Sequence, residues 1–353
     1  MTMTTKPPMD DLDKQLLNRL QWDFPMVPRP FHGLGQAVGT TESDILGRIA
    51  RLKADRVVRQ ISAIFDTRSL GYKSSLVAMK VRPDRVDEAA GVLNEHPGVS
   101  HNYKRNHDFN LWFTVAVPPS TSLEQTVETL HRLVGAQSTR ILQTLRLLKI
   151  GVKLDMTGKE DITAQSEDGY GDGQRPAEGP AGIGSEEIAY IRELQKDLPI
   201  QPEAFAPWAA ALGVTPEALL QRAARFQEQG YMRRFAAVLH HREAGFRANA
   251  MGVWKVPPDR VHDLGPKFAS FNAVSHCYQR PVYPDWPYNV FTMIHGRTSA
   301  DCEKVIQAIA SATGVTEYAV LYSTKEYKKT RVPYFTEAEE AWERKHLAPA
   351  PAA

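Results

Sequence analysis

The 353-residue sequence predicts an α+β protein built as a tandem duplication. Three observations predict this fold class. Segments of the first half return in the second half at a nearly constant offset. In each half, helical periodicity comes first and is followed by runs that read alternately as strands and helices. A polar stretch with almost no apolar residue separates the two halves.

The duplication rests on two repeated motifs. VRPDRV at 81–86 returns as VPPDRV at 256–261, and VSHNYKR at 99–105 returns as VSHCYQR at 274–280. Both motifs recur at an offset of 175 residues (256 minus 81, and 274 minus 99). Because two distant motifs share one offset, the whole module between them is copied.

The first part of each copy has a helix-turn-helix pattern. In copy one, leucines at 12, 16, 17 and 20 have helical spacing, a short helix follows at 34–38, and Gly39-Thr40-Thr41 leads into a third helix with Ile45, Ile49 and Leu52. Copy two repeats the order at 188–194, 208–212 and 219–226, with Gly213 in the turn. A tight junction between two helices favours glycine at that point.

The second part of each copy reads as a mixed sheet. In copy one we expect strands at 57–65, 75–81, 111–117 and 144–152, and helices at 84–94 and 123–133. Together with the polar turn between 101 and 114, these predict a βαββαβ-like sandwich in which helices cover one face of the sheet. Copy two is expected to repeat every element.

These patterns predict domain boundaries along the chain. The helix-turn-helix parts occupy 9–65 and 185–240, and the mixed parts occupy 66–156 and 241–330. Residues 157–184 are rich in Gly, Asp, Glu, Gln and Ser, so they are predicted to be a flexible linker, and 331–353 form a C-terminal extension with a short helix.

Composition limits the classes of function. Lys plus Arg total 43 against 41 Asp plus Glu, so a net charge of +2 provides no global attraction to nucleic acid. The start lacks an apolar signal segment and no apolar run approaches the ~20 residues that span a bilayer, so we expect no membrane insertion. With only two cysteines, neither a metal finger nor a disulfide framework is expected, and a cytoplasmic location fits.

This organisation resembles the leucine-responsive and asparagine-responsive (Lrp/AsnC) regulators, in which a winged helix-turn-helix precedes a ferredoxin-like ligand domain. The residues that carry the resemblance are Ile49 and Leu52 with VVR at 57–59, LGY at 70–72, and in copy two GYMR at 230–233 with Gly245-Phe246. The resemblance covers nearly all of both copies. It implies the fold, and it leaves the function open.

The helix that would read DNA begins with acidic residues in both copies. Thr41-Glu42-Ser43-Asp44 opens it in copy one and Pro216-Glu217 opens it in copy two. A reading helix needs basic or amide side chains there, because phosphates repel carboxylates. We therefore expect no DNA binding, and we expect Arg48 and Arg51 to pair with Glu42 and Asp55.

Chemistry-bearing residues concentrate in the repeated VSH segments. The period-two geometry of a strand places His101, Tyr103 and Arg105 on one face, with Asn102 and Lys104 on the other. Copy two repeats this face, and a Pro-Asp-Trp-Pro loop at 284–287 stands where copy one has His107. A single histidine is more often structural than catalytic. Its repetition beside Tyr and Arg favours a site for a flat anionic ligand.

SHNYKRNHDFNLWFTV (100–115), SHCYQRPVYPDWPYNVFTMIHG (275–296) and DFPMVPRPF (23–31) resemble the siroheme decarboxylases of heme d1 biosynthesis. In many of these enzymes two related subunits are separate chains, whereas here both are fused. The resemblance implies loss of carbon dioxide from the two acetate side chains of siroheme at C12 and C18, which gives 12,18-didecarboxysiroheme. The iron tetrapyrrole is then the substrate, and no further cofactor and no protein-bound metal is expected.

Site residues follow from the cluster and the resemblance together. His101 and His107 are the expected catalytic residues, as proton donor and positioning group, because imidazole can carry a proton near neutral pH. An axial iron ligand remains an alternative role for a histidine. The expected substrate-binding residues are Tyr103, Lys104, Arg105, Asn110, Trp112, Phe113, His276, Tyr278, Arg280, Asn289 and His295.

Two other functions remain open at this point. One is a transcription regulator of the Lrp/AsnC type that binds a small effector, and the other is a non-catalytic tetrapyrrole-binding protein. The fused copies are expected to pair pseudo-symmetrically within the chain, and further self-association is left open.

Overall fold

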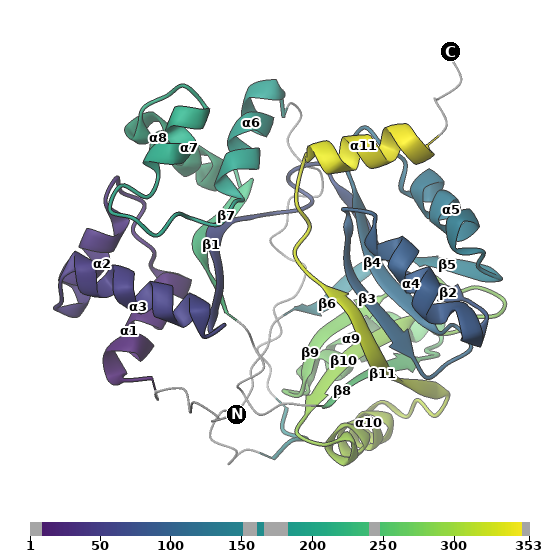
Figure 1. Cartoon of the computed structure of the whole chain (residues 1–353). Helices are drawn as coiled ribbons and strands as arrows, with labels where there is room; N and C mark the ends of the chain where they lie inside the picture. Colours follow the sequence, from purple (N-terminus) through teal and green to yellow (C-terminus); the bar gives the residue numbers. More distant parts are fainter. Residues whose placement is uncertain (1–8, 151–160, 166–182, 240–247, 348–353) are drawn as a thin grey trace, which may run out of the picture. The chain divides into compact units, whose positions relative to one another are not determined.

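The structure is a computed structural model that describes residues 9–150, 161–165, 183–239 and 248–347 (Figure 1). The described chain forms two compact units. One holds the helical parts of both copies, with 9–72, 183–239 and 333–336, and the other holds both mixed parts, with 73–150, 161–165, 248–332 and 337–347. Most of the predicted linker and the tail after 347 lie outside the described residues.

The helical unit contains the predicted helix-turn-helix twice. Copy one supplies α1 (Asp11–Trp22), α2 (Pro30–Val38) and α3 (Glu42–Ala54), and copy two supplies α6 (Ser185–Leu194), α7 (Ala206–Ala211) and α8 (Pro216–Glu228). The third helix of each copy begins where a threonine side chain, Thr41 or Thr215, accepts a backbone N–H. Gly39 and Gly213 adopt positive φ angles of 76° and 67° just before it, which explains the glycines in both turns.

Strands β1 (Val58–Phe65) and β7 (Met232–Leu239) join the two copies in this unit. They pair antiparallel in a two-stranded sheet, with Ile61 opposite Ala237. The expected place of 57–65 among the strands of the mixed sheet is wrong, and its place within the predicted helix-turn-helix part, 9–65, agrees with the structure. Apolar alternation shows that a segment is a strand, but it does not identify the partner strand.

The second unit contains a nine-stranded sheet and its covering helices. Copy one supplies β2 (Lys73–Lys80), α4 (Val86–Asn94), β3 (Val99–Arg105), β4 (Leu111–Val117), α5 (Leu123–Val134), β5 (Ser138–Leu142) and β6 (Arg146–Ile150). Copy two supplies β8 (Ala248–Trp254), α9 (Val261–Ser270), β9 (Val274–Gln279), β10 (Val290–Gly296), α10 (Ser299–Thr313), β11 (Tyr318–Lys329) and α11 (Glu337–His346). The repeated PDR tripeptides form short 3-10 turns at 83–85 and 258–260.

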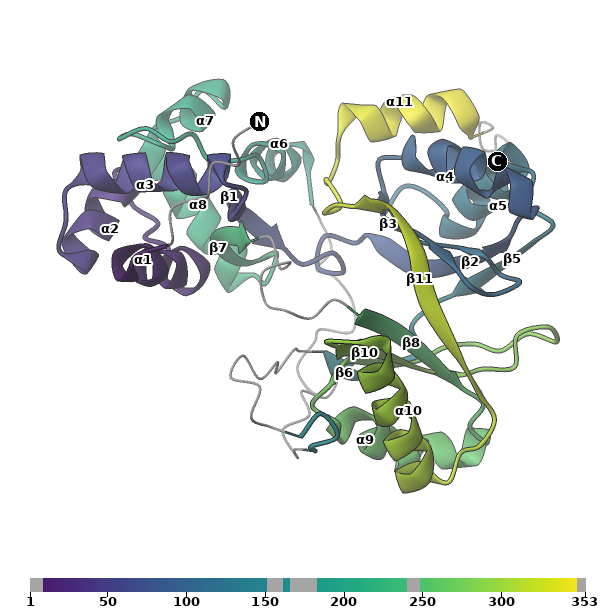
Figure 2. The ribbon, with the colours of Figure 1, turned by 60° about the horizontal axis from the view of Figure 1, so that its bottom comes forward.

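The two copies exchange strands across this sheet. The strand order is β5-β2-β4-β3-β11-β8-β10-β9-β6, so β6 of copy one pairs with β9 of copy two. The first half of β11 pairs with β8, and its second half pairs with β3 of copy one. Figure 2 shows β11 as the long strand that runs between the two parts of the sheet. The last strand of each copy, β6 or β11, therefore pairs with a strand of the other copy.

Three apolar clusters fill this unit. One lies between the copy-one strands and α4 and α5, and a second lies between the copy-two strands and α9 and α10. The third combines residues of both copies on the sheet face away from the helices, including Trp112, Trp286 and Leu321. The burial of large aromatic side chains in this shared cluster stabilises the pairing of the copies.

The C-terminal extension is packed rather than peripheral. Trp342 of α11 belongs to the copy-one core, and its ring centroid lies 4.2 Å from that of His96. The short predicted helix exists, and it covers the copy that is distant in sequence. Within the described part of the chain, no helix is long and apolar enough to cross a membrane.

Candidate active site

Strands β3 and β9 present the same polar face in both copies. Asn102 points to the helical side, where its amide donates to the Ala90 carbonyl at 3.1 Å. His101, Tyr103 and Arg105 therefore lie on the opposite face, as strand alternation predicts. In β9 the equivalent of Asn102 is Cys277, which is fully buried in the helix-side core.

The arginine of each face is buried and bonds to a backbone carbonyl of the other copy. Arg105 is 5% exposed and donates from Nη1 to the Leu321 carbonyl at 3.1 Å, and Arg280 is 8% exposed and donates from Nη1 to the Leu142 carbonyl. Leu321 lies in β11 and Leu142 in β5, so each guanidinium binds a strand of the other copy. Each arginine thus links the two copies through a hydrogen bond to a backbone carbonyl.

Both guanidinium groups lack an acidic partner among the described residues. No ion pair involves either side chain there, and the Nε of each is buried without a hydrogen-bond partner. Arg105 lies 5.8 Å from the ring centroids of Tyr103 and Trp112, and Arg280 lies 4.7 Å from that of Tyr278. Burial lowers the pKa of both arginines to about 10, so both remain charged near neutral pH. A buried cation without a carboxylate is costly unless an anionic ligand approaches it.

Histidines and a serine form a connected chain in copy two. Ser275, which is 1% exposed, has its Oγ 2.8 Å from His276 Nδ1 and 2.6 Å from His295 Nε2. His295 Nδ1 lies 2.6 Å from Oδ1 of Asn249, an exposed residue. Burial, followed by the charges of His276 and Lys329, lowers the pKa of His295 to about 4, so this imidazole is neutral at pH 7.

Copy one contains only the first part of this chain. Ser100 Oγ lies 3.0 Å from His101 Nδ1. Ala116 is the copy-one equivalent of His295. The Ala116 N–H donates to the Gly98 carbonyl, and the His295 N–H donates to the carbonyl of Ala273, which is the copy-two equivalent of Gly98. Lys329 lies opposite His101 in the pairing of β11 with β3, and the same lysine lowers the pKa of His295. The two histidine faces therefore lie near one cation.

His107 lies away from His101, at the far end of β3. Its Nδ1 accepts the Phe109 N–H at 3.0 Å, and its ring lies 5.3 Å from the ring of Trp286. Burial lowers its pKa. It lines a cavity of about 360 Å³ together with Lys80, Asp108, Phe109 and Asp285. The structure thus separates the two histidines that the sequence analysis grouped as catalytic.

Several other predicted site residues hold the fold together or lie away from the histidine face. Asn110 and Asn289 each bond through both amide groups to one backbone unit, that of Val81 and of Val256. Phe113 lies in the helix-side core, on the opposite side of β4 from Trp112. The charge of Lys104 acts on Asp87 of α4, which places this lysine on the helix side. The structure does not bring Phe113 or Lys104 to the histidine face.

The sequence analysis did not nominate Ser275, Asn249 or Trp286. The signal for Ser275 was present, because a serine precedes the histidine in both VSH motifs. Trp286 comes from the Pro-Asp-Trp-Pro loop of copy two and packs on Phe109 and Trp112 of copy one, with ring centroids 5.7 Å and 5.2 Å away. Asn249 has no sequence signal, because it reaches His295 only through strand pairing.

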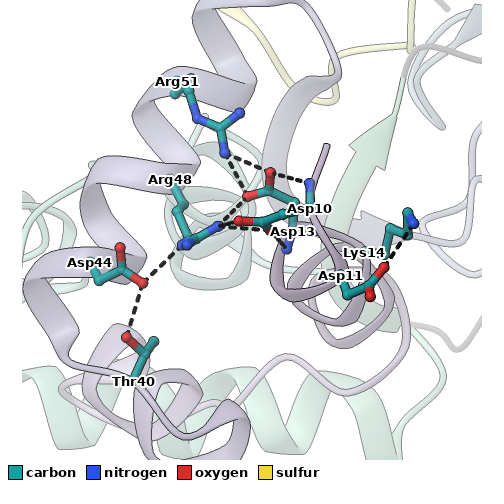
Figure 3. A network of polar contacts seen from close by, with 8 residues as sticks. All are labelled: Asp10, Asp11, Asp13, Lys14, Thr40, Asp44, Arg48 and Arg51. Atoms are coloured by element: carbon teal, nitrogen blue, oxygen red, sulfur yellow. Dashed lines mark hydrogen bonds and ion pairs between the residues drawn. The ribbon is translucent and has the colours of Figure 1, made fainter. Parts of the chain in front are cut away.

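In the helical unit, carboxylates hold the arginines of α3 (Figure 3). Arg48 bonds to Asp10, Asp13 and Asp44 at 2.7–2.9 Å, and Arg51 bonds to Asp13 at 2.6 Å. The sequence analysis named Glu42 and Asp55 as the partners of these arginines. The Glu42 part of this prediction is wrong, because Glu42 pairs with Arg29 and the carboxylate that both arginines share is the buried Asp13. In copy two, Arg222 of α8 pairs in the same way with Glu186 and Glu187 of α6.

Family comparisons agree with this geometry. The AsnC-like ligand binding domain matches residues 69–149 and 243–328, and the siroheme decarboxylase NirDL-like HTH domain matches 13–59 and 187–233. The siroheme decarboxylase of Hydrogenobacter thermophilus is 40% identical over 334 residues, covering 94% of this chain and 97% of that protein. The chain belongs to the siroheme decarboxylase family.

Two further relatives of this siroheme decarboxylase family member show how its parts correspond. The siroheme decarboxylase beta subunit of Methanosarcina barkeri is 43% identical over 146 residues, which is 41% of this chain and 96% of that subunit. A crystal structure of the siroheme decarboxylase NirDL in co-complex with an iron-uroporphyrin III analogue matches with a TM-score of 0.75 at 34% identity, covering 96% of this chain and 99% of the other. A single subunit thus spans less than half of the fused chain.

Proposed function

We propose that this chain decarboxylates the C12 and C18 acetate side chains of siroheme to 12,18-didecarboxysiroheme. Family membership supports the reaction class, and the solved relative with an iron-uroporphyrin III analogue supports a tetrapyrrole ligand. The observation that carries the proposal is the pair of buried guanidinium groups, Arg105 and Arg280, which lie against aromatic rings and have no acidic partner in the described part of the chain. A flat ring rich in carboxylates complements such a surface.

The reaction replaces each acetate carboxylate with a proton. The bond between the methylene carbon and the carboxylate carbon breaks, carbon dioxide leaves, and the electron pair moves toward the macrocycle. A proton then joins the former methylene carbon, which becomes a methyl group. Because the macrocycle of the substrate can accept the electron pair, the proposal includes no separate cofactor and no metal other than the iron of the substrate.

Histidines on the face supply the proton in this proposal. His101 and His276 occupy equivalent strand positions, and each has a tyrosine ring about 6 Å away, at 6.3 Å for Tyr103 and 6.1 Å for Tyr278. A positioned acid typically contributes a factor of about 10²–10⁴ to the rate. His107 is left out of this role, because it lies at the other end of β3 and its Nδ1 is bonded to the Phe109 N–H.

The proposal also assigns no DNA-binding role to the helix-turn-helix parts. Arg48 and Arg51 of α3 and Arg222 of α8 are bonded to carboxylates of α1 and α6, so their charges are neutralised locally. Phosphate contacts from free cations provide most of the affinity of proteins for DNA. A cytoplasmic location belongs to the same proposal, and the free thiols of Cys277 and Cys302 fit a reducing compartment.

Anaerobic incubation of the full chain with siroheme tests the proposal. Absorbance titration measures binding, and mass spectrometry of the recovered tetrapyrrole measures reaction. The expected product has lost two carbon dioxide molecules. Binding with unchanged mass would indicate a carrier, and a salt-sensitive, sequence-specific gel shift without tetrapyrrole binding would indicate a regulator.

A further inference from the structure

Four polar groups from three neighbouring strands meet on the histidine face of copy two. Asn249 lies on β8, Ser275 and His276 on β9, and His295 on β10. Their contacts, at 2.6–2.8 Å, run in one line from the exposed Asn249 through His295 and Ser275 to His276. Ser275 Oγ is also 3.3 Å from the Met293 carbonyl, a longer contact than either histidine contact.

The direction of these hydrogen bonds follows from which atoms can donate. The Asn249 oxygen only accepts, so His295 donates from Nδ1. His295 is neutral, because its pKa is lowered to about 4, so its Nε2 must accept the Ser275 hydroxyl proton. The Ser275 oxygen then accepts from Nδ1–H of His276. This order leaves His276 Nε2 as the nitrogen that gains and loses the proton.

We propose that Asn249, His295 and Ser275 form a positioning relay that holds His276 in the Nδ1–H tautomer and directs its Nε2 toward the substrate. The proposal rests on the proposed decarboxylation. In the transfer step the Nε2–H bond of protonated His276 breaks, and the proton joins the carbon that has lost carbon dioxide. His276 returns to the neutral Nδ1–H form, so every relay hydrogen bond is the same before and after transfer.

The relay positions His276 and does not itself deliver protons. Because the pKa of His295 is far below 7, this imidazole carries no second proton to pass on at neutral pH. The charge of Lys329 contributes to this by disfavouring protonation of His295. A pre-set tautomer is valuable because a misplaced catalytic group reduces the rate even when the substrate binds.

Copy one provides the matched comparison within the same chain. Ser100 contacts His101 Nδ1 at 3.0 Å, but Ala116 stands at the position of His295 and has no hydrogen-bonding side chain. The relay is therefore a property of copy two. The two halves have the same strand geometry and differ in how strongly the histidine tautomer is specified.

The first test measures the tautomer without substrate, by two-dimensional NMR of the full chain labelled with ¹⁵N-histidine. The signals of His276 are assigned by their loss in His276→Gln. We expect His276 to carry its proton on Nδ1 in the parent, and Ser275→Ala to shift it toward a mixture with Nε2–H. Asn249→Ala, at an exposed position, should produce the same shift in a variant that folds. A parent His276 protonated on Nε2 would overturn the relay.

The second test measures turnover of siroheme by the same variants. Ser275→Ala and Asn249→Ala should lower kcat about tenfold with little change in KM, a smaller loss than the ~10²–10⁴-fold of removing a positioned acid. Ser275→Thr, which keeps the hydroxyl group, should recover most of the rate, and Ser100→Ala should have the smaller effect. Equal rates in Ser275→Ala and the parent would overturn the relay. A parent that binds siroheme without releasing carbon dioxide would overturn the proposed function instead, whatever the tautomer result.

Discussion

Residues of one type have different roles here according to their hydrogen-bond partners. His276 and His101 each follow a serine and precede a tyrosine by two residues, yet of these two only His276 is linked through its serine to a second imidazole. Arg48 is neutralised by carboxylates, whereas Arg105 is more deeply buried and, within the described chain, contacts a backbone carbonyl and aromatic rings and no carboxylate. The residue types alone would not distinguish these cases. Electrostatic surroundings decide which arginine is available to an anionic substrate.

The arginine assignment predicts a loss of siroheme binding with little change in stability. Arg105→Met and Arg280→Met should each weaken siroheme binding about 10–100-fold, because a charge-assisted hydrogen bond is worth about 1.5–3 kcal/mol. Removal of a buried unpaired cation should leave the free energy of unfolding within about 1 kcal/mol of the parent. Absorbance titration and urea unfolding check both expectations. Arg82→Met, at an exposed ion pair with Asp84, is the control and should change neither. Unchanged affinity in both buried variants would contradict the assignment.

At the scale of elements, strand identity was predictable and strand partnership was not. The sequence predicted the helices and most strands, and the alternation of β3 correctly separated His101 from Asn102. It did not predict that β1 pairs with β7 or that β6 joins β9, because pairing between distant segments leaves no local pattern. The relay was missed for the same reason. Asn249 and His295 are neighbours only through the register of β8 and β10.

The ion-pair network between α1 and α3 predicts unequal effects of two matched substitutions. Asp13 is 1% exposed and binds both Arg48 and Arg51, so Asp13→Asn should destabilise the fold by about 1–3 kcal/mol. Glu187 occupies the equivalent position in copy two, and its ion pair with Arg222 is more exposed. Glu187→Gln should therefore cost less than about 1 kcal/mol. Urea unfolding of the two variants gives the comparison, and equal losses would count against a special role for the buried carboxylate.

The contact of α11 predicts a loss of stability in acid. His96 is 2% exposed against Trp342, and burial, assisted by the charges of Lys328 and His346, lowers its pKa to about 3. His96 therefore binds a proton near pH 6.5 in the unfolded chain but only near pH 3 in the folded chain. Stability should fall as pH decreases through this window, by at most about 1.4 kcal/mol per pH unit from this group.

His96→Gln tests this source of acid sensitivity. Glutamine does not titrate, so the dependence of the unfolding midpoint on pH between 6.5 and 4 should become shallower than in the parent. The measurement is urea unfolding at several pH values in that range. His262→Gln, at an exposed position, is the control and should follow the parent curve. Parallel curves for His96→Gln and the parent would assign the acid sensitivity to other groups.

At the scale of the whole molecule, the duplication was visible in the sequence and its consequence was not. The repeated motifs predicted two equivalent faces, and each face was found on its strand. Because β6 and β11 pair with strands of the other copy, the sheet of each copy lacks a strand when the other copy is absent. No sequence motif indicates this pairing, which depends on how the chain connects the strands. The pairing of the halves is thus built from backbone hydrogen bonds as well as apolar contacts.

Strand exchange predicts how separated halves should behave. Residues 1–156 and 185–353, produced together as two chains, should assemble and recover activity, because the connection supplies only effective concentration. Each half produced alone should associate with itself or aggregate, since its sheet lacks a partner strand. Co-purification and light scattering check this. Two stable, separately folded monomers that do not bind each other would contradict the exchanged arrangement.

An anaerobic assay of histidine variants tests whether the paired histidine faces form the siroheme decarboxylase site. The parent, His101→Ala and His276→Ala are incubated anaerobically with siroheme at fixed pH, and binding and product mass are measured on the same samples. We expect all three proteins to bind siroheme, the parent to remove two carbon dioxide molecules, and each variant to react more slowly. The larger loss, of about 10²–10⁴-fold, is expected in His276→Ala. Variants that bind siroheme and decarboxylate it at the parental rate would show that these histidines are not the proton donors.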